Sequence, residues 1–561
     1  MLDLANKNVM RLYFALRWRA KRLFRAIPET ASRWRRLLVT LAFYTKLSKK
    51  LLPATALKIK AKEALSSNVL EAADLAQRVL ETAPSVDNMR WACMMLWSAG
   101  QICEAHRILS AIPEARLTAA EKERALQIRG AFELYTNAPV IPNCPQVKNY
   151  TPIARRIMYV ASSSQPYHIS GYTTRTHHLL QALKNAGWIM HCVTRPGYPM
   201  DRPDAQGIDS PVVNSVDGVV YERVFGKHRR EVQYDLYIQE AAAALITAAI
   251  RIKPAVIHAA SNYEAGLPAL IAARYLGIPF CYEVRGLWEY TAASKKPGWE
   301  HTERFDLDRM MEAHVAKNAD QVFTLTRALA NELVHRGVSE TRIELLPNAV
   351  DLEHFKPRLR DDCLAEELGI GRDTFICGYI GSIVKYEGLD DLLTAFRVVV
   401  EKIRNAKLLI VGAGNELPAL YQRAERLGLA SHVVFTGRVP HAEVLRYFSL
   451  LDVVVLPRKP YAVCKLVSPL KPFEAMAMRL PLIVSDVDAL SEMFEHGETA
   501  LIHEAGDHES LADAIIKLAE NPSLSNYLAE NAYSQVSSNC QWNQVITPVC
   551  EFYTRSVANR S

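Results

Sequence analysis

Residues 456–486 read LPRKPYAVCKLVSPLKPFEAMAMRLPLIVSD, a strand, a cation-rich loop, a helix and a second strand in succession. The helix is expected to begin at Pro472-Phe473-Glu474, because proline suits a first helical turn. Four cations precede or begin it: Arg458, Lys459, Lys465 and Lys471. Glu474 has a simple structural interpretation, since the helix dipole stabilises an acidic residue in the first turn. The four cations ahead of the same helix start favour a site for an anion.

Short apolar runs alternate with helical patterns on both sides of this stretch. The first series is RRIMYVA (155–161), AVIHA (255–259), PFCYEV (279–284) and QVFTLT (321–326). The second is FICGYIGSI (375–383), KLLIVGAG (407–414), VVFTG (433–437), DVVVLP (452–457) and PLIVSD (481–486). Uninterrupted apolar runs are typical of buried parallel strands. The chain therefore predicts an α/β fold with two Rossmann-like domains, 153–345 and 346–535, facing each other across a cleft, with ligands at the carboxyl ends of the strands.

Glycines after two of these runs indicate which ligands suit the cleft. Gly381 and Ser382 follow an apolar run, and a glycine turn there lets backbone N–H groups approach a phosphate, although an ordinary turn is the alternative. The motif Gly412-Ala413-Gly414 lacks the third glycine of a dinucleotide fingerprint, so no nicotinamide cofactor is expected. We interpret two aspartate pairs as structural and expect no metal: Asp306 with Asp308, and Asp486 with Asp488.

Seven blocks of the sequence resemble, in order, those of the family 4 retaining glycosyltransferases, which have the GT-B fold. PLKPFEAMA followed by LPLIVSD is similar to the family's donor-site signature. The other blocks are ISGYTTRTHHLLQAL, PFCYEVRGLWE, LLPNAVD, FICGYIGSI with EGLDDLLTAF, LLIVGAGNE and VVFTGRV. The resemblance extends over roughly residues 155–535 and includes bacterial capsule and exopolysaccharide glycosyltransferases. It implies two Rossmann-like domains preceded here by an all-α region.

The resemblance also implies roles for individual residues. Glu474 would hold the nucleotide ribose, and Lys471 and Arg458 would neutralise the diphosphate, making these three the candidate catalytic residues. Further donor-binding candidates are Gly381 and Ser382 at the phosphates, Val434 and Phe435 at the base, Ser468 in the donor loop, and Gly171 and Tyr172 closing from the first domain. Candidates for holding acceptor or sugar are Glu283, Arg285 and Glu289.

Three positions depart from the family pattern. Leu466 stands eight residues before Glu474, where the family often has a second glutamate. Ser382 and Glu387 replace the usual arginine and lysine of the glycine-turn block, and Arg285 replaces a common histidine. We expect Arg458 and Lys471 to supply the cations that the glycine turn lacks.

The function implied is transfer of a sugar, with retention, from a nucleotide-diphosphate sugar to a glycan or lipid-linked glycan in surface polysaccharide biosynthesis. A UDP-sugar is the favoured donor substrate, and no cofactor is expected. Two alternatives remain open at this point. One is a sugar-nucleotide epimerase on the same fold, and the other is an inactive GT-B scaffold recruited to a membrane.

Residues 1–50 contain 13 Lys/Arg against only Asp3 and Glu29, whereas the whole chain carries a net charge of +7. Apolar residues recur there at helical spacing, which predicts basic amphipathic helices at an anionic membrane surface. The candidate membrane residues are Arg11, Arg17, Trp18, Arg19, Lys21, Arg22, Phe24, Arg25 and Trp34. A helix that packs on the protein is the alternative; nucleic acid is not favoured, because no recognition motif accompanies the charge.

The remaining segments complete the domain organisation. Residues 51–136 have helical periodicity and form either tetratricopeptide-like repeats, which could bind other polysaccharide-assembly proteins, or plain helical hairpins. Residues 137–152 are proline-rich and predict a linker, and 536–561 predict a helix that packs back on the N-terminal half. The ten cysteines form no CxxC pair, and no secretory signal or membrane span is visible. We therefore expect a cytoplasmic protein attached peripherally to the inner face of the cell membrane.

Overall fold

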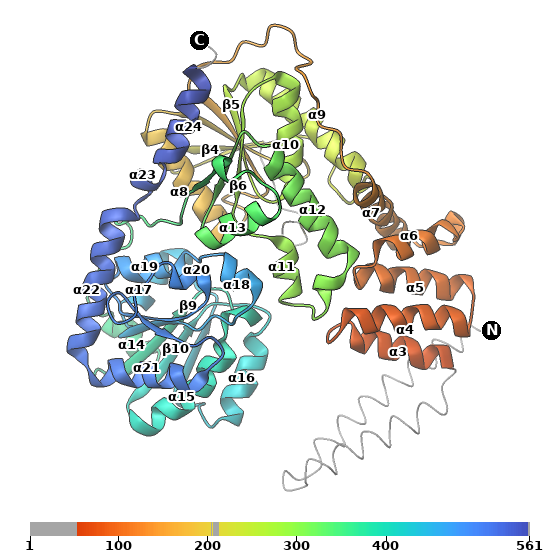
Figure 1. Cartoon of the computed structure of the whole chain (residues 1–561). Helices are drawn as coiled ribbons and strands as arrows, with labels where there is room; N and C mark the ends of the chain where they lie inside the picture. Colours follow the sequence, from red (N-terminus) through yellow and green to blue (C-terminus); the bar gives the residue numbers. More distant parts are fainter. Residues whose placement is uncertain (1–52, 203–204, 206–211, 559–561) are drawn as a thin grey trace.

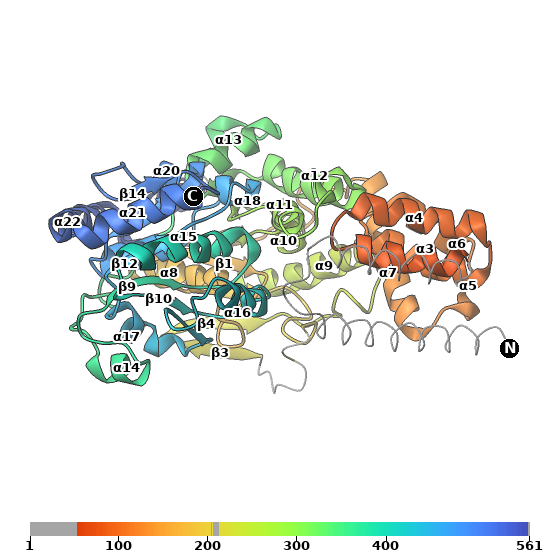
Figure 2. The same cartoon turned by 90° about the horizontal axis from the view of Figure 1, so that it is seen from below.

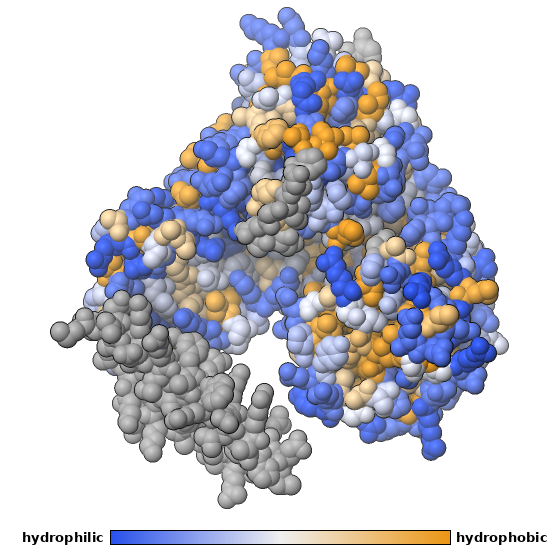
Figure 3. Space-filling view, turned by 180° about the vertical axis from the view of Figure 1, so that it is seen from behind, coloured by the Kyte–Doolittle hydropathy of each residue, from blue (hydrophilic) through white to orange (hydrophobic). Residues whose placement is uncertain are grey.

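The computed structural model describes residues 53–202, 205 and 212–558 (Figure 1). The head at 1–50, with its candidate membrane residues from Arg11 to Trp34, lies outside the described residues, so its membrane role stays a prediction. In the part of the chain that is described, no helix has the length and apolar content that crossing a bilayer requires. On the face seen in Figure 3, hydrophobic residues form separate patches among hydrophilic ones.

The first α/β domain is built on an eight-stranded sheet with the order β3-β4-β2-β1-β5-β6-β7-β8. Its strands are β1 Arg156–Ala161, β2 Ile189–Thr194, β3 Val213–Val216, β4 Val219–Arg223, β5 Val256–Ala260, β6 Phe280–Val284, β7 Gln321–Thr324 and β8 Ile343–Leu345. Neighbouring strands run parallel except β3, which is antiparallel to β4. Every residue of β5 and β6 is buried, which is why these strands read as unbroken apolar runs.

Helices cover both faces of this sheet, so alternate residues of β1 pack into two separate cores. Met158 and Val160 pack with one set of helices, whereas Ile157 and Tyr159 pack with α8 and the C-terminal end of the chain. The helices of the domain are α8 Gly171–Asn185, α9 Tyr234–Ile252, α10 Tyr263–Leu276, α11 Trp288–Ala293, α12 Glu303–Asn318 and α13 Arg327–His335.

The second α/β domain contains a six-stranded, fully parallel sheet with the order β11-β10-β9-β12-β13-β14. Its strands are β9 Phe375–Ile380, β10 Ala406–Val411, β11 Val433–Gly437, β12 Val453–Leu456, β13 Leu482–Ser485 and β14 Leu501–His503. Its helices are α14 Asp362–Glu367, α15 Leu389–Lys402, α16 Leu417–Arg426, α17 Val444–Phe448, α18 Ala462–Leu466, α19 Lys471–Ala477, α20 Asp488–Ser491, α21 His508–Glu520 and α22 Pro522–Asn539.

The N-terminal helical region packs directly on the first α/β domain and is not a free spacer (Figure 1). Its helices are α3 Pro53–Ala64, α4 Val69–Thr82, α5 Val86–Ser98, α6 Ile102–Ser110 and α7 Ala119–Thr136. The Cys103 backbone N–H donates to the Glu303 carboxylate over 2.7 Å, and the Arg304 N–H donates to the Gly100 carbonyl over 3.0 Å. Both bonds attach α6 and the turn before it to the start of α12. The tetratricopeptide-like interpretation stays a prediction.

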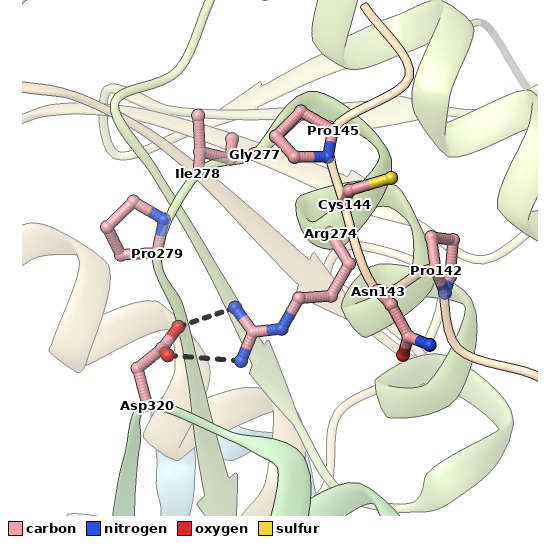
Figure 4. Close-up of a pocket in the computed structure, with 9 residues that line it drawn as sticks. All are labelled: Pro142, Asn143, Cys144, Pro145, Arg274, Gly277, Ile278, Pro279 and Asp320. Atoms are coloured by element: carbon pink, nitrogen blue, oxygen red, sulfur yellow. Dashed lines mark hydrogen bonds and ion pairs between the residues drawn. The ribbon is translucent and has the colours of Figure 1, made fainter.

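Residues 137–152 contain no helix or strand and run along the amino-terminal edge of the first sheet. Pro145 packs against Gly277, and the Gln146 N–H donates to the Tyr275 carbonyl over 2.8 Å. A surface pocket of about 230 Å³ lies beneath this segment (Figure 4). Its two charged residues, Arg274 and Asp320, form a two-pronged ion pair with each other, over 2.8 and 3.0 Å. The pocket therefore offers a ligand no unpaired charge, and it lies at the edge of the sheet opposite the strand ends that face the cleft.

The C-terminal end of the chain returns to the first domain after the second is complete. Helices α23 Trp542–Val545 and α24 Thr547–Ala558 belong to the core beside α8 (Figure 1). The Tyr553 hydroxyl lies 2.7 Å from Nδ1 of the fully buried His258 in β5. Where the chain crosses back, the Val350 N–H donates to the Cys540 carbonyl over 3.0 Å, so the two connections between the domains run side by side.

Candidate functional site

Two glycines allow the turn after β9 to pack closely against the loop that follows β12, which is the donor loop. Gly381 has φ of +154°, and a Cβ on it would lie 2.1 Å from Cε of Lys471. Gly388 has φ of +74°, and a Cβ there would lie 1.8 Å from the Pro457 carbonyl oxygen. Side chains at these positions would clash, so glycine allows the aliphatic part of Lys471 to lie directly on the turn. The structure thus brings Gly381 and Lys471, two of the candidate donor-site residues, into contact.

Glu387 lies behind this contact, and its pairing with the two cations was not predicted from the sequence. Its side chain is 3% exposed and contacts both cations: Lys471 Nζ lies 2.8 Å from Oε2, and Arg458 Nη2 lies 3.3 Å from Oε1. Burial alone would raise the pKa of this carboxyl, but the Lys471 ammonium and the Arg458 guanidinium outweigh burial and lower its pKa to about 2. Glu387 is therefore ionised and bridges the two cations. Its place in the glycine-turn block, where the family usually has lysine, was the available signal.

Arg458, the other candidate for neutralising the diphosphate, is buried. Its exposed fraction is 4%, and it donates to the Val467 carbonyl over 2.7 Å as well as to Glu387. The other two cations of the stretch do not converge on this point. Lys459 pairs with Asp390 and Asp391 over 2.9 Å, and Lys465 is exposed. Of the four, Lys471 is the cation that lies at the glycine turn.

Glu474 lies one helical turn after Lys471 in α19 and is half-buried. Burial raises the pKa of its carboxyl to about 7, against the opposing effect of Lys471. None of the described residues donates a hydrogen bond to this carboxylate or lies close enough to form an ion pair with it. Because α19 spans only seven residues, the anion site rests on Lys471 and the glycine turn, not on the helix dipole.

The other donor-side candidates line the same edge of the second sheet. Ser382 is exposed, and its carbonyl accepts a hydrogen bond from the Tyr379 hydroxyl over 2.8 Å. Val434 and Phe435 are half-buried in β11, at the far end of the sheet from β14, and the Phe435 ring lies 4.4 Å from that of Tyr421. Phe435 and Tyr421 thus pack against each other at the β11 side of this sheet, with β10 between them and β9.

Ser468 is fixed to the connection between the domains. Asn348 Nδ2 donates to the Ser468 carbonyl over 2.9 Å, while the Asn348 amide oxygen accepts from Arg175 in α8 over 3.0 Å. Arg175 also donates to the Leu346 and Pro347 carbonyls, over 2.7 and 2.8 Å. Asn348 lies 120 residues from Ser468 and 173 residues from Arg175 in the chain, so no local sequence pattern could predict this connection.

The first domain approaches the donor loop at two glycines. A Cβ on Gly171, the first residue of α8, would lie 3.8 Å from Leu470, and one on Gly286 would lie 3.5 Å from Val467. Gly171 therefore lies next to the donor loop, and its closing over the phosphates stays a prediction. Tyr172 is held within its own domain, because its hydroxyl accepts from the Ser162 N–H over 3.0 Å and its ring lies 4.8 Å from the Arg285 guanidinium.

Glu283, Arg285 and Glu289 are buried, which corrects their assignment to an acceptor or sugar. Glu283 is fully buried and contacts Arg175 and Arg285, each over 2.7 Å. These guanidiniums outweigh burial and hold the pKa of Glu283 well below its usual range. Glu289 is 1% exposed and pairs with Arg336 over 2.6 Å. Both carboxylates are thus taken up by ion pairs inside the first domain, and the guanidinium of Arg285, 7% exposed, contacts Glu283 and Thr176.

Within the described ranges, no three His, Cys, Asp or Glu side chains gather in a way that could hold a metal ion. That the enzyme needs no metal remains a prediction, which a chelator can test.

Comparison with known proteins identifies the family. Residues 362–535 match the family model described as glycosyl transferases group 1, and residues 170–349 match the glycosyl transferase 4-like domain. The chain is 26% identical over 308 residues to the capsular polysaccharide biosynthesis glycosyltransferase CapM of Staphylococcus aureus, covering 52% of this chain and 76% of CapM. The two matched models together account for more than half of the chain.

Solved structures share the fold at low identity. Sucrose-phosphate synthase from Thermosynechococcus elongatus superposes with a TM-score of 0.59 at 20% identity, over 72% of this chain and 99% of that one. HepE from Anabaena, solved in complex with UDP, has a TM-score of 0.55 at 17% identity, over 71% and 100%. The predicted GT-B fold is confirmed. The chain belongs to family 4 of the glycosyltransferases and is an enzyme that uses a nucleotide-sugar donor.

Proposed function

We propose that this enzyme transfers a sugar from a UDP-sugar to a glycan or lipid-linked glycan, with retention, in the assembly of a bacterial surface polysaccharide. The observation that carries the proposal is Lys471, held against the Gly381 turn by a buried carboxylate and next in the chain to Leu470, which Gly171 of the other domain approaches. Two comparisons support the choice of substrates. HepE was solved with UDP and with UDP-glucose, and CapM is a capsular polysaccharide enzyme.

In this proposal Lys471 and the Ser382 N–H of the glycine turn bind the diphosphate of the donor, because the Gly381 N–H already donates to the Val411 carbonyl, and Glu474 accepts hydrogen bonds from the ribose. The base lies against Val434 and Phe435, Ser468 shapes the donor loop, and Gly171 closes the phosphate site from the first domain. As the bond between the sugar C1 and the diphosphate breaks, negative charge grows on the leaving oxygen, where a fixed ammonium lowers the barrier. The acceptor oxygen bonds to C1 from the same face, and its proton passes to the leaving phosphate.

Residues 1–50 would hold the enzyme on the cytoplasmic face of the cell membrane, where a lipid-linked acceptor is presented. The charge of this segment supports that placement, since basic amphipathic sequences bind anionic bilayers. The outer surface of α3–α7 would then be available to other polysaccharide-assembly proteins.

A panel of nucleotide sugars tests the function. We expect one UDP-sugar to raise the melting temperature of the full-length protein, since a ligand bound only by the folded state stabilises it by RT ln(1 + [L]/Kd). The same donor should be consumed faster when a glycan acceptor is added, and EDTA should leave the rate unchanged. Isomerisation of the donor without acceptor would show an epimerase. Loss of activity in EDTA, restored by a divalent ion, would show a metal site.

The pKa of Glu474 predicts a pH-dependent donor affinity. Because its pKa is raised to about 7, the carboxyl is increasingly protonated below that pH and can no longer accept both ribose hydroxyls. We expect the Kd for UDP-glucose to rise by up to about tenfold per pH unit between pH 7 and pH 5.5. Glu474→Gln should be insensitive to pH in this range and bind more tightly than Glu474→Ala, because the amide keeps one acceptor. Calorimetric titrations at four pH values measure this, and equal affinity of the two variants would make Glu474 a helix-start residue only.

A further inference from the structure

We propose that Glu387 is a positioning residue for donor binding: it holds Lys471 against the Gly381 turn as a charged, pre-aligned ammonium that the donor diphosphate then engages. The inference rests on the proposed function, because it assumes that the diphosphate binds at Lys471. It assigns a role to an acidic residue at a position where the family usually has lysine.

The Glu387 carboxylate lies between two cations, and the Tyr379 hydroxyl is a further neighbour. Its two oxygens are divided between the cations, with Oε2 directed to Lys471 and Oε1 to Arg458. It ends the short turn η5 Lys385–Glu387, and Gly388 then places that turn against the Pro457 carbonyl, at the end of β12. The carboxylate therefore sits where the turn after β9 and the donor loop meet, and it joins these two segments.

The charges show why the carboxylate is needed. Lys471 has 16% of its side chain exposed, and burial lowers the pKa of its ammonium while Glu387 opposes this effect. The Arg458 guanidinium lowers the pKa of Lys471 further, by repulsion. The Glu474 carboxyl also raises the pKa of Lys471, but its effect is smaller than that of Glu387. Without Glu387, two cations would share a buried site without their common counter-charge, and the lysine would be the one to lose its proton, because arginine does not deprotonate in proteins. A neutral amine cannot neutralise a diphosphate.

The same argument separates this arrangement from an inhibitory ion pair. If Glu387 merely competed with the donor for Lys471, removing its charge would strengthen donor binding at every pH. If it keeps Lys471 protonated, removing its charge leaves binding intact at low pH and weakens it at high pH. The two cases differ in the shape of a pH profile, which a purely structural role would not change.

The experiment is a titration of UDP-glucose into full-length protein between pH 6.5 and pH 9.5, where the diphosphate of this donor keeps its charge. For Glu387→Gln we expect the Kd at pH 6.5 to stay within about threefold of the unmodified protein and the Kd at pH 9 to be at least about tenfold higher. Asp390→Asn is the matched control, since it removes a neighbouring carboxylate that pairs with Lys459 and not with Lys471. This control should follow the unmodified profile.

Glu387→Asp keeps the proposal testable if Glu387→Gln does not fold. It retains the charge on a shorter side chain, so we expect a weaker Kd at all pH values and no added alkaline loss. Parallel pH profiles for the unmodified protein and Glu387→Gln, or tighter binding by Glu387→Gln throughout, would overturn the inference. An alkaline loss in Glu387→Asp as large as that expected for Gln would also overturn it. If the unmodified protein binds neither UDP-glucose nor any donor of the panel, the proposed function fails first, and the inference fails with it.

Discussion

Lys471→Ala should lower kcat/KM by about 10²-fold or more, because it removes the ammonium that lies against the Gly381 turn in a largely buried position. Folding should survive, since Glu387 keeps its contact with Arg458 and remains paired. Most of the loss should appear in kcat if the charge acts chiefly on the leaving diphosphate, and in KM if it acts equally on the bound donor. Steady-state rates at varied donor concentration, with the melting temperature of each variant, measure both.

Lys402→Ala is the control for this variant. Lys402 is exposed at the end of α15 in the same domain, so its loss should leave kcat/KM within about twofold. Full activity of Lys471→Ala at an unchanged melting temperature would refute the diphosphate assignment. A collapsed melting temperature would instead mean that the ion cluster is needed for folding, and Lys471→Gln, which keeps the stem of the side chain against Gly381, would then decide the question.

Deleting residues 1–50 should release the protein from anionic liposomes. Each basic residue near such a surface contributes about 1 kcal/mol, so about five of the 13 in this segment amount to roughly 5 kcal/mol, more than a thousandfold in membrane partitioning. Trp18, Phe24 and Trp34 would add apolar burial, which salt does not screen, so moderate salt should weaken binding without abolishing it. Flotation of full-length and truncated protein with anionic and with neutral vesicles measures the difference.

The truncation should leave catalysis itself unchanged. The described helical region begins at Pro53 and packs on the first domain through its own contacts, so removing 1–50 leaves those contacts in place. Turnover of a short soluble acceptor should therefore stay within about twofold, while transfer to a lipid-linked acceptor should slow. Truncated protein that still floats with the vesicles, or full-length protein that ignores them, would make the segment a packing or partner-binding element.

The strands were predictable where both faces of the sheet are buried. The runs at β1, β5, β6, β7, β9, β10, β12 and β13 are continuous and mostly buried, because each strand has a neighbour on both sides in its sheet. The edge strands differ: β11 is half-buried over most of its length, yet its run VVFTG is apolar enough to be recognised. β3 reads VNSV, is exposed or half-buried along its length, and pairs only with β4, so its four residues have no distinctive pattern.

The chemistry of the site was predictable only where it depends on residues that lie close together in the chain. The local sequence shows that Lys471 and Glu474 begin a helix next to a loop, and both lie at the cleft edge of the sheet. Arg458 and Glu283 were expected to face ligand, yet their environments are set by partners 71 and 108 residues away. Whether a charged side chain is a ligand contact or half of a buried pair depends on those partners, which one sequence does not reveal.

The position of α24 has a consequence for the order of events during synthesis. Tyr553 contacts His258 across 295 residues, and Trp542, Val549 and Phe552 fill the same core of the first domain. A ribosome delivers these side chains only after the whole second domain has been made. Until then the nascent first domain has one unfinished face, with the imidazole of His258 and the hydrophobic residues around it open to water. The earlier half of the protein therefore completes its folding last, and a chain released before α24 is translated would be a substrate for chaperones and proteases.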